Sequence, residues 1–204
     1  MPGTAPRLAV IALCLTTAAP YCAAQRCNAP HYRWSEKVST ALIRQRPETT
    51  TIAMILTRWS IPPIGPGAGY WCSGRVDRER QVYVVAGWLR YADTIKDDGD
   101  WHLELTHAPD DAREQCIVVE IPAPRWGSVY AAPRATLDSV MRTVRLSRGG
   151  RVSPPVRIRV IGPAFFDAEH VHGSRHLRAQ GHGHCNSSLL ALWEVHPVYR
   201  VERP

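Results

Sequence analysis

The sequence lacks the short motifs that identify common classes of hydrolase and metalloprotein. It has no CxxC pair, no HExxH motif and no GxSxG nucleophile elbow. These absences argue against a cysteine zinc site, a thioredoxin-like redox pair, a zincin protease and a serine hydrolase. No glycine-rich loop precedes a predicted helix, so a phosphate-cradling nucleotide site is not expected either.

The chain also has few long, uninterrupted runs of apolar residues. The apolar run at residues 8–19 follows Arg7 and precedes the small residues of Cys22-Ala23-Ala24. A membrane-spanning helix needs about 20 apolar residues, whereas this layout is typical of a cleaved secretory signal peptide. We therefore predict that residues 1–24 are removed, that the protein is secreted or periplasmic, and that the mature chain has no transmembrane segment.

Cleavage would leave an even number of cysteines in an oxidising compartment. The four are Cys27, Cys72, Cys116 and Cys185. Small exported domains commonly pair such cysteines, so we predict two disulfide bonds, with all three connectivities open.

Basic residues outnumber acidic ones. Lysine and arginine number 25 against 18 aspartate and glutamate, which gives a formal net charge of +7. A basic exported domain favours anionic partners, such as an anionic polymer or an envelope component. The charges are spread along the chain, so a simple contribution to solubility is the alternative interpretation.

The first part of the mature chain, residues 25–75, is expected to be an N-terminal extension. Ser35 and Pro47 bound a predicted helix over residues 35–46, and residues 50–59 predict a strand. The prolines and glycines of residues 61–69 predict a loop, because proline lacks the backbone donor and glycine is too flexible for regular structure.

Residues 76–204 are expected to form one barrel domain. The pattern predicts strands at residues 81–91, 101–107, 116–121, 156–161 and 189–201, and a helix that begins at Pro133 and ends before Gly149. Three strands, a helix and two strands is the order of an OB-fold. We predict a mainly β protein, with a five-stranded OB-like barrel plus the extension; an α+β sandwich is the alternative.

Residues 192–199 predict a strand on which Glu194 and His196 share one face. In an OB-like barrel the third strand neighbours the fifth, which brings Glu120 near this pair. The catalytic candidates are Asp100, His102, Glu120, Glu194 and His196. The metal candidates are Asp167, His170, Glu194 and His196. Carboxylate and imidazole groups bind zinc or manganese and perform acid–base catalysis, although turn, capping and strand-pairing roles are the alternative.

Five of the nine histidines lie between residues 170 and 184. Histidine-rich tracts can bind transition metals, so His172, His182 and His184 form a weaker candidate metal site. Glycines surround them, so we expect this segment to be a solvated loop without a preorganised site.

Four segments together resemble a group of uncharacterised exported bacterial proteins. The segments read DGDWHLEL, IVVEIP, RVIGPAFFDAEH and LWEVHPV, and the group shares a DGD-x-H, EIP, FFD-x-x-H and E-x-HPV series in this order. The resemblance covers roughly residues 80–201. It implies an OB-like barrel and no established activity.

A second resemblance is to the thermonucleases, which are also OB-folds. Asp98-Gly99-Asp100 and Glu120-Ile121-Pro122 are similar to their two acidic motifs, which hold calcium beside a phosphodiester. Their catalytic arginine falls within Gln115-Cys116-Ile117 here, and their catalytic glutamate corresponds to Ala123 or Pro124. The resemblance therefore implies the fold without that chemistry.

Two functions follow from these patterns. The first is a non-enzymatic binding module for an anionic extracellular ligand or envelope component, with Arg157 and Arg159 as candidate ligand contacts. The alternative is a metal-dependent, phosphodiesterase-like hydrolase that uses the acidic and histidine residues at the strand ends.

Overall fold

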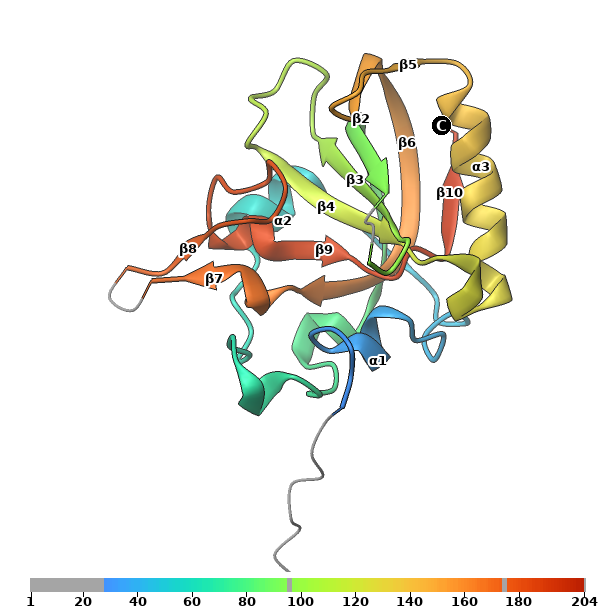
Figure 1. The fold of residues 1–204 in the computed structure, drawn as a ribbon. Coiled ribbons are helices and arrows are strands. Elements are labelled where there is room, and N and C mark those ends of the chain that lie inside the picture. Colours follow the sequence, from blue (N-terminus) through green and yellow to red (C-terminus); the bar gives the residue numbers. More distant parts are fainter. Residues whose placement is uncertain (1–27, 95–96, 174–175, 204) are drawn as a thin grey trace, which may run out of the picture.

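The centre of the structure is a barrel closed by hydrogen bonds between its first and fourth long strands. A computed structural model describes residues 28–94, 97–173 and 176–203 of the chain (Figure 1). Around the barrel the strands follow the order β2 (Val82–Thr94), β3 (Trp101–Thr106), β4 (Cys116–Ile121), β9 (Trp193–Val195) and β6 (Arg151–Phe166). Strands β6 and β2 pair antiparallel and close the barrel, and β4 pairs with β9 in parallel. The predicted OB-like barrel is confirmed.

Period-two alternation fills the barrel and leaves polar side chains outside. On β3, Leu103 and Leu105 are fully buried in the main core, and on β4 the same is true of Ile117 and Val119. Successive side chains of a strand point to opposite faces, so the residues between these positions face away from the core. Those outward positions include the acidic and histidine residues of the site described below.

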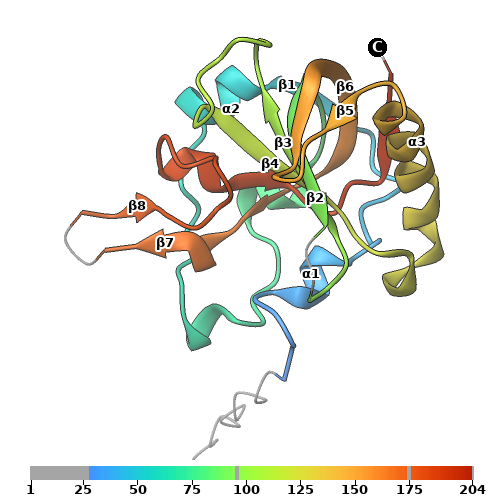
Figure 2. The same cartoon turned by 45° about the horizontal axis from the view of Figure 1, so that its top comes forward.

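The helix α3 (Ala131–Met141) connects β4 to β6 and lies beside β10 (Arg200–Glu202) (Figures 1 and 2). Leu137 and Val140 form its buried stripe, as the sequence predicts. The helix ends eight residues earlier than Gly149, because the chain then forms β5 (Arg145–Leu146), which pairs with β6.

The predicted helix over residues 35–46 is wrong. Only α1 (Trp34–Lys37) is helical there. The Tyr130 hydroxyl donates a hydrogen bond to the Val38 carbonyl at 2.8 Å, and the Tyr199 hydroxyl donates to the Ser39 carbonyl at 2.9 Å. These two carbonyls are therefore engaged by side chains of the barrel domain instead of continuing a helix.

The predicted strand over residues 50–59 is also wrong. The chain forms a short strand, β1 (Glu48–Thr51), that pairs parallel with β2, and then the helix α2 (Ile52–Arg58). The Thr51 hydroxyl oxygen accepts a hydrogen bond from the Met54 amide at 3.1 Å and caps the helix. Ile52 and Ile55 are three residues apart on its buried face, and both join the core of the barrel.

The last predicted strand, residues 189–201, is not continuous. It consists of a short 3₁₀ helix η6 (Leu189–Leu192), then β9, then β10. Pro197 separates β9 from β10, because proline has no amide to continue a ladder. The preceding strand, β6, is longer than predicted.

The remaining short elements are η1 (Ala68–Tyr70), η2 (Asp77–Arg80), η3 (Pro124–Trp126), η4 (Ser128–Tyr130), η5 (Ala168–His170), β7 (Val171–His172) and β8 (Arg178–Ala179).

A disulfide bond between Cys116 and Cys185 joins the start of β4 to the loop after β8. Cys72 is also disulfide-bonded, whereas Cys27 and the predicted signal peptide lie outside the described residues. Among the ranges that the structure describes, no helix has both the length and the hydrophobicity of a membrane span.

A buried ion pair attaches the N-terminal segment to the end of β6. Both Arg33 and Glu79 have fully buried side chains, and two guanidinium nitrogens of Arg33 donate to the two carboxylate oxygens of Glu79 at 2.7 and 2.8 Å. One of these oxygens also accepts the Phe166 amide at 2.8 Å. The pair thus fixes the position of α1 relative to Asp167, the residue that follows β6.

Replacing one partner of this ion pair should be strongly destabilising. Glu79→Gln leaves a buried guanidinium without a counter-charge, so we expect the free energy of unfolding to fall by about 3–5 kcal/mol. The matched control is Glu202→Gln, whose partner Arg159 is exposed and whose loss should cost less than about 1 kcal/mol. Urea unfolding measures both; equal stability of the two variants would contradict the assigned role.

Candidate functional site

A cavity of about 630 Å³ lies against the outer face of the barrel. It is lined by the outward side chains of β3, β4 and β9, by residues after β6, and by the loop after β8. Its carboxylates are Asp93, Asp97, Asp98, Glu104, Glu120, Asp167, Glu169 and Glu194; its histidines are His31, His102, His170, His182 and His184; its lysine is Lys37. Eight carboxylates, five histidines and one lysine thus line this acidic cavity, which makes it a candidate site for cations.

Strand pairing brings the predicted acid and histidine residues together. His102 of β3 pairs directly with Glu120 of β4, and their Nδ1 and Oε1 atoms are 2.9 Å apart. The neighbouring pairing of β4 with β9 places Glu194 on the same face. The Nδ1 atom of His196 lies 3.1 Å from Glu120 Oε2 and 3.2 Å from Glu194 Oε2. The four side chains form one continuous chain of interactions across three strands.

Asp100 extends this chain beneath the floor of the cavity. Its Oδ1 atom accepts the Ala123 amide at 2.9 Å, while its Oδ2 atom lies 3.6 Å from His196 Nε2. The side chains of Asp100 and His196 are both fully buried. Asp98 also has a turn role, because its Oδ1 atom accepts the Asp100 amide at 2.9 Å.

Asp167, directly after β6, and Glu194, on the adjacent strand β9, both line the cavity. The Lys37 ammonium donates to Asp167 Oδ2 at 2.8 Å, and His182 Nε2 lies 2.6 Å from Glu194 Oε1. His170 is more distant, with its Nε2 atom 3.9 Å from Asp167 Oδ2. Asp167 also caps the chain after β6, since its Oδ1 atom accepts the Glu169 amide. The predicted capping role and a place in the cluster therefore coexist.

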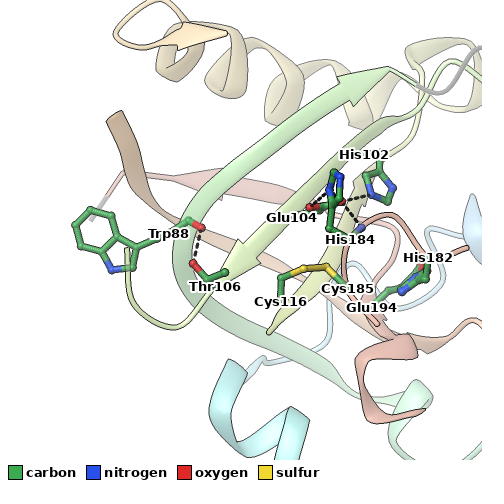
Figure 3. The surroundings of a disulfide bond; sticks show 9 residues. All are labelled: Trp88, His102, Glu104, Thr106, Cys116, His182, His184, Cys185 and Glu194. Carbon is green, nitrogen blue, oxygen red and sulfur yellow. Dashed lines mark hydrogen bonds and ion pairs between the residues drawn. A yellow bond between two sulfur atoms is a disulfide. The ribbon is translucent and has the colours of Figure 1, made fainter. Parts of the chain in front are cut away.

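The structure places the histidine-rich segment differently from the expected solvated loop. The Cys116–Cys185 disulfide holds the part that precedes Cys185 against the barrel, and Figure 3 shows His184 beside Glu104 and His182 beside Glu194 around this bond; His172 and His176 are exposed, as expected. His184 Nδ1 lies 2.9 and 2.8 Å from the two carboxylate oxygens of Glu104. His182 and His184 thus bind separate carboxylates of the barrel instead of forming a loop site.

The carboxylates keep the two barrel histidines charged. Burial alone would lower the pKa of His102, but the neighbouring carboxylates of Glu104 and Glu120 outweigh it and raise the pKa to about 10. Burial likewise opposes the charge on His196, yet the charge of Glu120, together with its other acidic neighbours, raises its pKa to about 9. Both imidazoles therefore carry a proton at neutral pH in the metal-free protein.

The pKa of Glu194 is lowered, in contrast to the raised pKa values of His102 and His196. Burial would raise its pKa, but hydrogen bonds from His182 and His196 hold the pKa well below its usual range. For Lys37, burial favours the neutral amine, whereas the charges of Asp167 and Glu194 raise its pKa above the usual value. Glu194 and Lys37 are therefore each held in the charged form by neighbours of opposite charge.

Four buried polar atoms in the described part of the chain have no hydrogen-bond partner. They are Asp100 Oδ2, His102 Nε2, His182 Nδ1 and His196 Nε2. Buried polar groups are normally satisfied, so a concentration of exceptions in one cluster indicates a ligand-binding role. The 3.6 Å separation of Asp100 Oδ2 and His196 Nε2 is too long for a hydrogen bond, but it is close to the ~3.4 Å between two ligands of one tetrahedral metal.

Two groups of buried side chains have the composition and spacing of a metal site. One is Asp100, Glu120 and His196, and the other is Asp167, His182 and Glu194; in each group the ligand atoms lie within 4.8 Å of one another. Carboxylate and imidazole ligands suit zinc, manganese or iron. A third group contains Cys116 and Cys185, whose sulfur atoms are joined in the disulfide and offer no thiolate.

Most of the sequence-derived candidates belong to this cluster, and some do not. His172 is exposed on β7, and Arg157 and Arg159 are exposed on β6; none of the three lines either cavity found among the described residues. Sequence reasoning missed Glu104 and Lys37. Period-two alternation with His102 could have identified Glu104, whereas no local signal connects Lys37 to Asp167.

Comparison with known proteins does not assign this chain to a family. No protein-family model, no curated protein sequence and no solved structure matches this chain. The resemblances to the exported bacterial group and to the thermonucleases remain predictions from motifs.

The raised histidine pKa values predict a loss of stability at alkaline pH. A histidine whose pKa is higher in the folded state stabilises the fold fully below its unfolded value of 6.5, and this contribution disappears as pH rises through the folded value. For metal-free protein we expect the free energy of unfolding to fall by roughly 3 kcal/mol between pH 6.5 and 9 from His196 alone, and further toward pH 10 from His102.

Urea unfolding in the presence of EDTA, repeated across this pH range, measures the slope. His196→Gln should flatten it, whereas His172→Gln, which alters an exposed histidine, should leave it unchanged. Equal slopes in the His196→Gln variant and the unmodified protein would contradict the charged-imidazole assignment.

Proposed function

We propose that this protein is a divalent-metal-dependent hydrolase whose metal is held by Asp167, His182 and Glu194. The observation that carries the proposal is the position of these three buried side chains, which lie within ligand distance of one another and also line the acidic cavity. Catalytic metal sites typically combine three protein ligands with an open position for water. A bound zinc or manganese ion would polarise the substrate and lower the pKa of a bound water molecule.

The second group, Asp100, Glu120 and His196, supports the first. Asp100 and His196 are fully buried and do not line the cavity, so a substrate has no access to them. His196 contacts Glu120 and Glu194 through one nitrogen, and thereby orients both carboxylates. Such outer contacts fix ligand geometry and tune the metal.

Two further side chains are placed to assist hydrolysis. Glu120 holds His102 through Nδ1, which leaves the protonated Nε2 atom directed away from that carboxylate, and His102 also lines the cavity. This arrangement suits a general acid that donates a proton to a leaving group. Lys37 lies beside Asp167 at the cavity and is placed to stabilise negative charge that develops on the substrate.

A non-enzymatic binding module through Arg157 and Arg159 has less support. Both side chains are exposed on β6, and Arg159 forms an ion pair with Glu202 at 3.1 Å. Neither residue lines the acidic cavity, where the buried polar side chains gather. We therefore favour the enzymatic proposal.

Metal binding and turnover test the proposal on the same protein. Protein stripped with EDTA should bind one zinc or manganese ion by calorimetry, and should hydrolyse at least one of bis(p-nitrophenyl) phosphate, p-nitrophenyl phosphate and p-nitrophenyl acetate only after metal is restored. Glu194→Gln and Asp167→Asn remove a ligand charge, so we expect metal affinity to fall about 100-fold and turnover to be lost.

Three controls locate the site. If the metal is held by Asp167, His182 and Glu194, the Asp100→Asn variant should have a higher metal affinity than the Asp167→Asn variant. His172→Ala with His176→Ala removes two exposed loop histidines and should change neither binding nor turnover. Circular dichroism confirms that each variant is folded. Stoichiometric binding without any turnover would refute the hydrolase, and absence of binding would refute the metal centre as well.

We also propose that the protein acts outside the cytoplasm. The Cys116–Cys185 disulfide supports this location, since such bonds persist mainly in oxidising compartments. When the full sequence is expressed in a bacterial host, we expect the cleaved protein, with Gln25 as its first residue, in the periplasm or the medium. Recovery of uncleaved chain from the cytoplasm alone, shown by mass spectrometry, would contradict export.

A further inference from the structure

A second cavity, of about 260 Å³, adjoins the acidic cavity. It is lined by Arg90, Tyr91, Glu104, Thr106, Arg113, Cys116, Gly149, Arg151 and His184. We call it the arginine cavity. Tyr91, Glu104 and His184 line both cavities, so a single layer of side chains separates them. A molecule that occupied the acidic cavity would thus have the arginine cavity beside it.

Three arginines reach this cavity from separate parts of the fold. Arg90 lies on β2, Arg113 on the loop between β3 and β4, and Arg151 at the start of β6. The pairing of β2 with β3 shifts register between Leu89 and Tyr91, which makes Arg90 the extra residue of a β-bulge against β3. A bulge redirects side chains, and here Arg90 and Tyr91 both line the same cavity.

The three guanidinium groups lack acidic partners. Among the described residues, none of Arg90, Arg113 and Arg151 takes part in an ion pair, and Arg90 Nη1 donates only to the Asp111 carbonyl, at 3.1 Å. By contrast, the buried Arg33 is paired with Glu79. Like charges gathered at one cavity repel each other unless an anion lies between them.

Glu104 does not supply that anion. Its carboxylate accepts the His184 amide at 2.9 Å and also contacts the His184 ring, while His102 Nε2 lies 3.5 Å away. Its charge is therefore directed toward the histidines of the cluster. The arginines remain available to a ligand.

We propose that the arginine cavity binds a tetrahedral oxyanion, a phosphate or sulfate group, carried by the substrate of the acidic cavity. This inference rests on the proposed hydrolase function for its catalytic meaning. Guanidinium groups present paired donors that match the oxygens of such anions, and three of them can surround one group. The volume is below the ~300–1,000 Å³ of sites that enclose a whole small molecule, which suits a single substituent.

Inorganic anions test the subsite without any metal. EDTA-treated protein is titrated with sodium phosphate, sodium sulfate and sodium acetate, and binding is measured by calorimetry. Phosphate or sulfate should bind more tightly than acetate, because acetate offers two oxygens instead of four. The preferred tetrahedral anion identifies the substrate group as a phosphate or a sulfate.

Matched arginine variants locate the binding. Arg113→Gln with Arg151→Gln should weaken phosphate or sulfate binding about tenfold or more, because charge-assisted hydrogen bonds are lost. All four arginines are exposed at the surface, but Arg157 and Arg159 do not line the arginine cavity, so Arg157→Gln with Arg159→Gln removes the same charge and should leave binding unchanged. Equal losses in both variants, undiminished binding in the Arg113 and Arg151 variant, or equal affinity for acetate would overturn the inference.

A separate measurement distinguishes this inference from the hydrolase proposal. The Arg113 and Arg151 variant should bind zinc or manganese as the unmodified protein does. For an ester substrate that the protein hydrolyses and that carries a phosphate or sulfate group, the KM of this variant should rise about tenfold while its kcat changes little. If Glu194→Gln loses metal binding but still binds phosphate or sulfate, the two sites are independent of each other. If the arginine variant has a lower kcat and an unchanged KM, the proposal of an anion subsite is wrong.

Discussion

The parallel pairing of β4 with β9 is the constraint on which the site depends. It aligns Val118 with Glu194, and the same strand β4 is aligned with β3 on its other side. Because side chains alternate along each strand, these registers place His102, Glu120 and Glu194 on one outer face. A shift of one residue in either pairing would turn a carboxylate toward the apolar core, where its charge would have no partner. The same core that stabilises the barrel therefore specifies the acidic cluster.

The strand components of the cluster could be predicted from the sequence. Alternation identified the outward positions of His102 and Glu194, and the strand order of an OB-like barrel placed Glu120 beside them. These predictions depend on two regular features, the period of a strand and the order of strands in a closed sheet. The identity of an ion or substrate does not follow from either.

Other parts of the site depend on contacts between distant segments. Lys37 reaches Asp167 because the Arg33–Glu79 ion pair fixes α1 against the end of β6, and no sequence pattern reports that pairing. The Cys116–Cys185 bond holds the loop of His182 against β4, close to Glu194, and connectivity cannot be deduced from cysteine spacing. The helix predicted over residues 35–46 failed for the same reason: the hydroxyl groups of Tyr130 and Tyr199, which engage the carbonyls of Val38 and Ser39, come from far along the chain.

The Cys116–Cys185 bond closes a segment of 69 residues, with β4 at one end and the His182 loop at the other. In the reduced chain the two ends of this segment are free to separate, so holding the His182 loop against β4 costs entropy that grows with the length of the segment. His182 is itself only 12 residues from Glu194, so the disulfide adds a second tether to the one that the chain already provides. Thiol oxidation therefore favours the arrangement in which His182 meets Glu194, and a change in redox state would be felt at this face of the barrel.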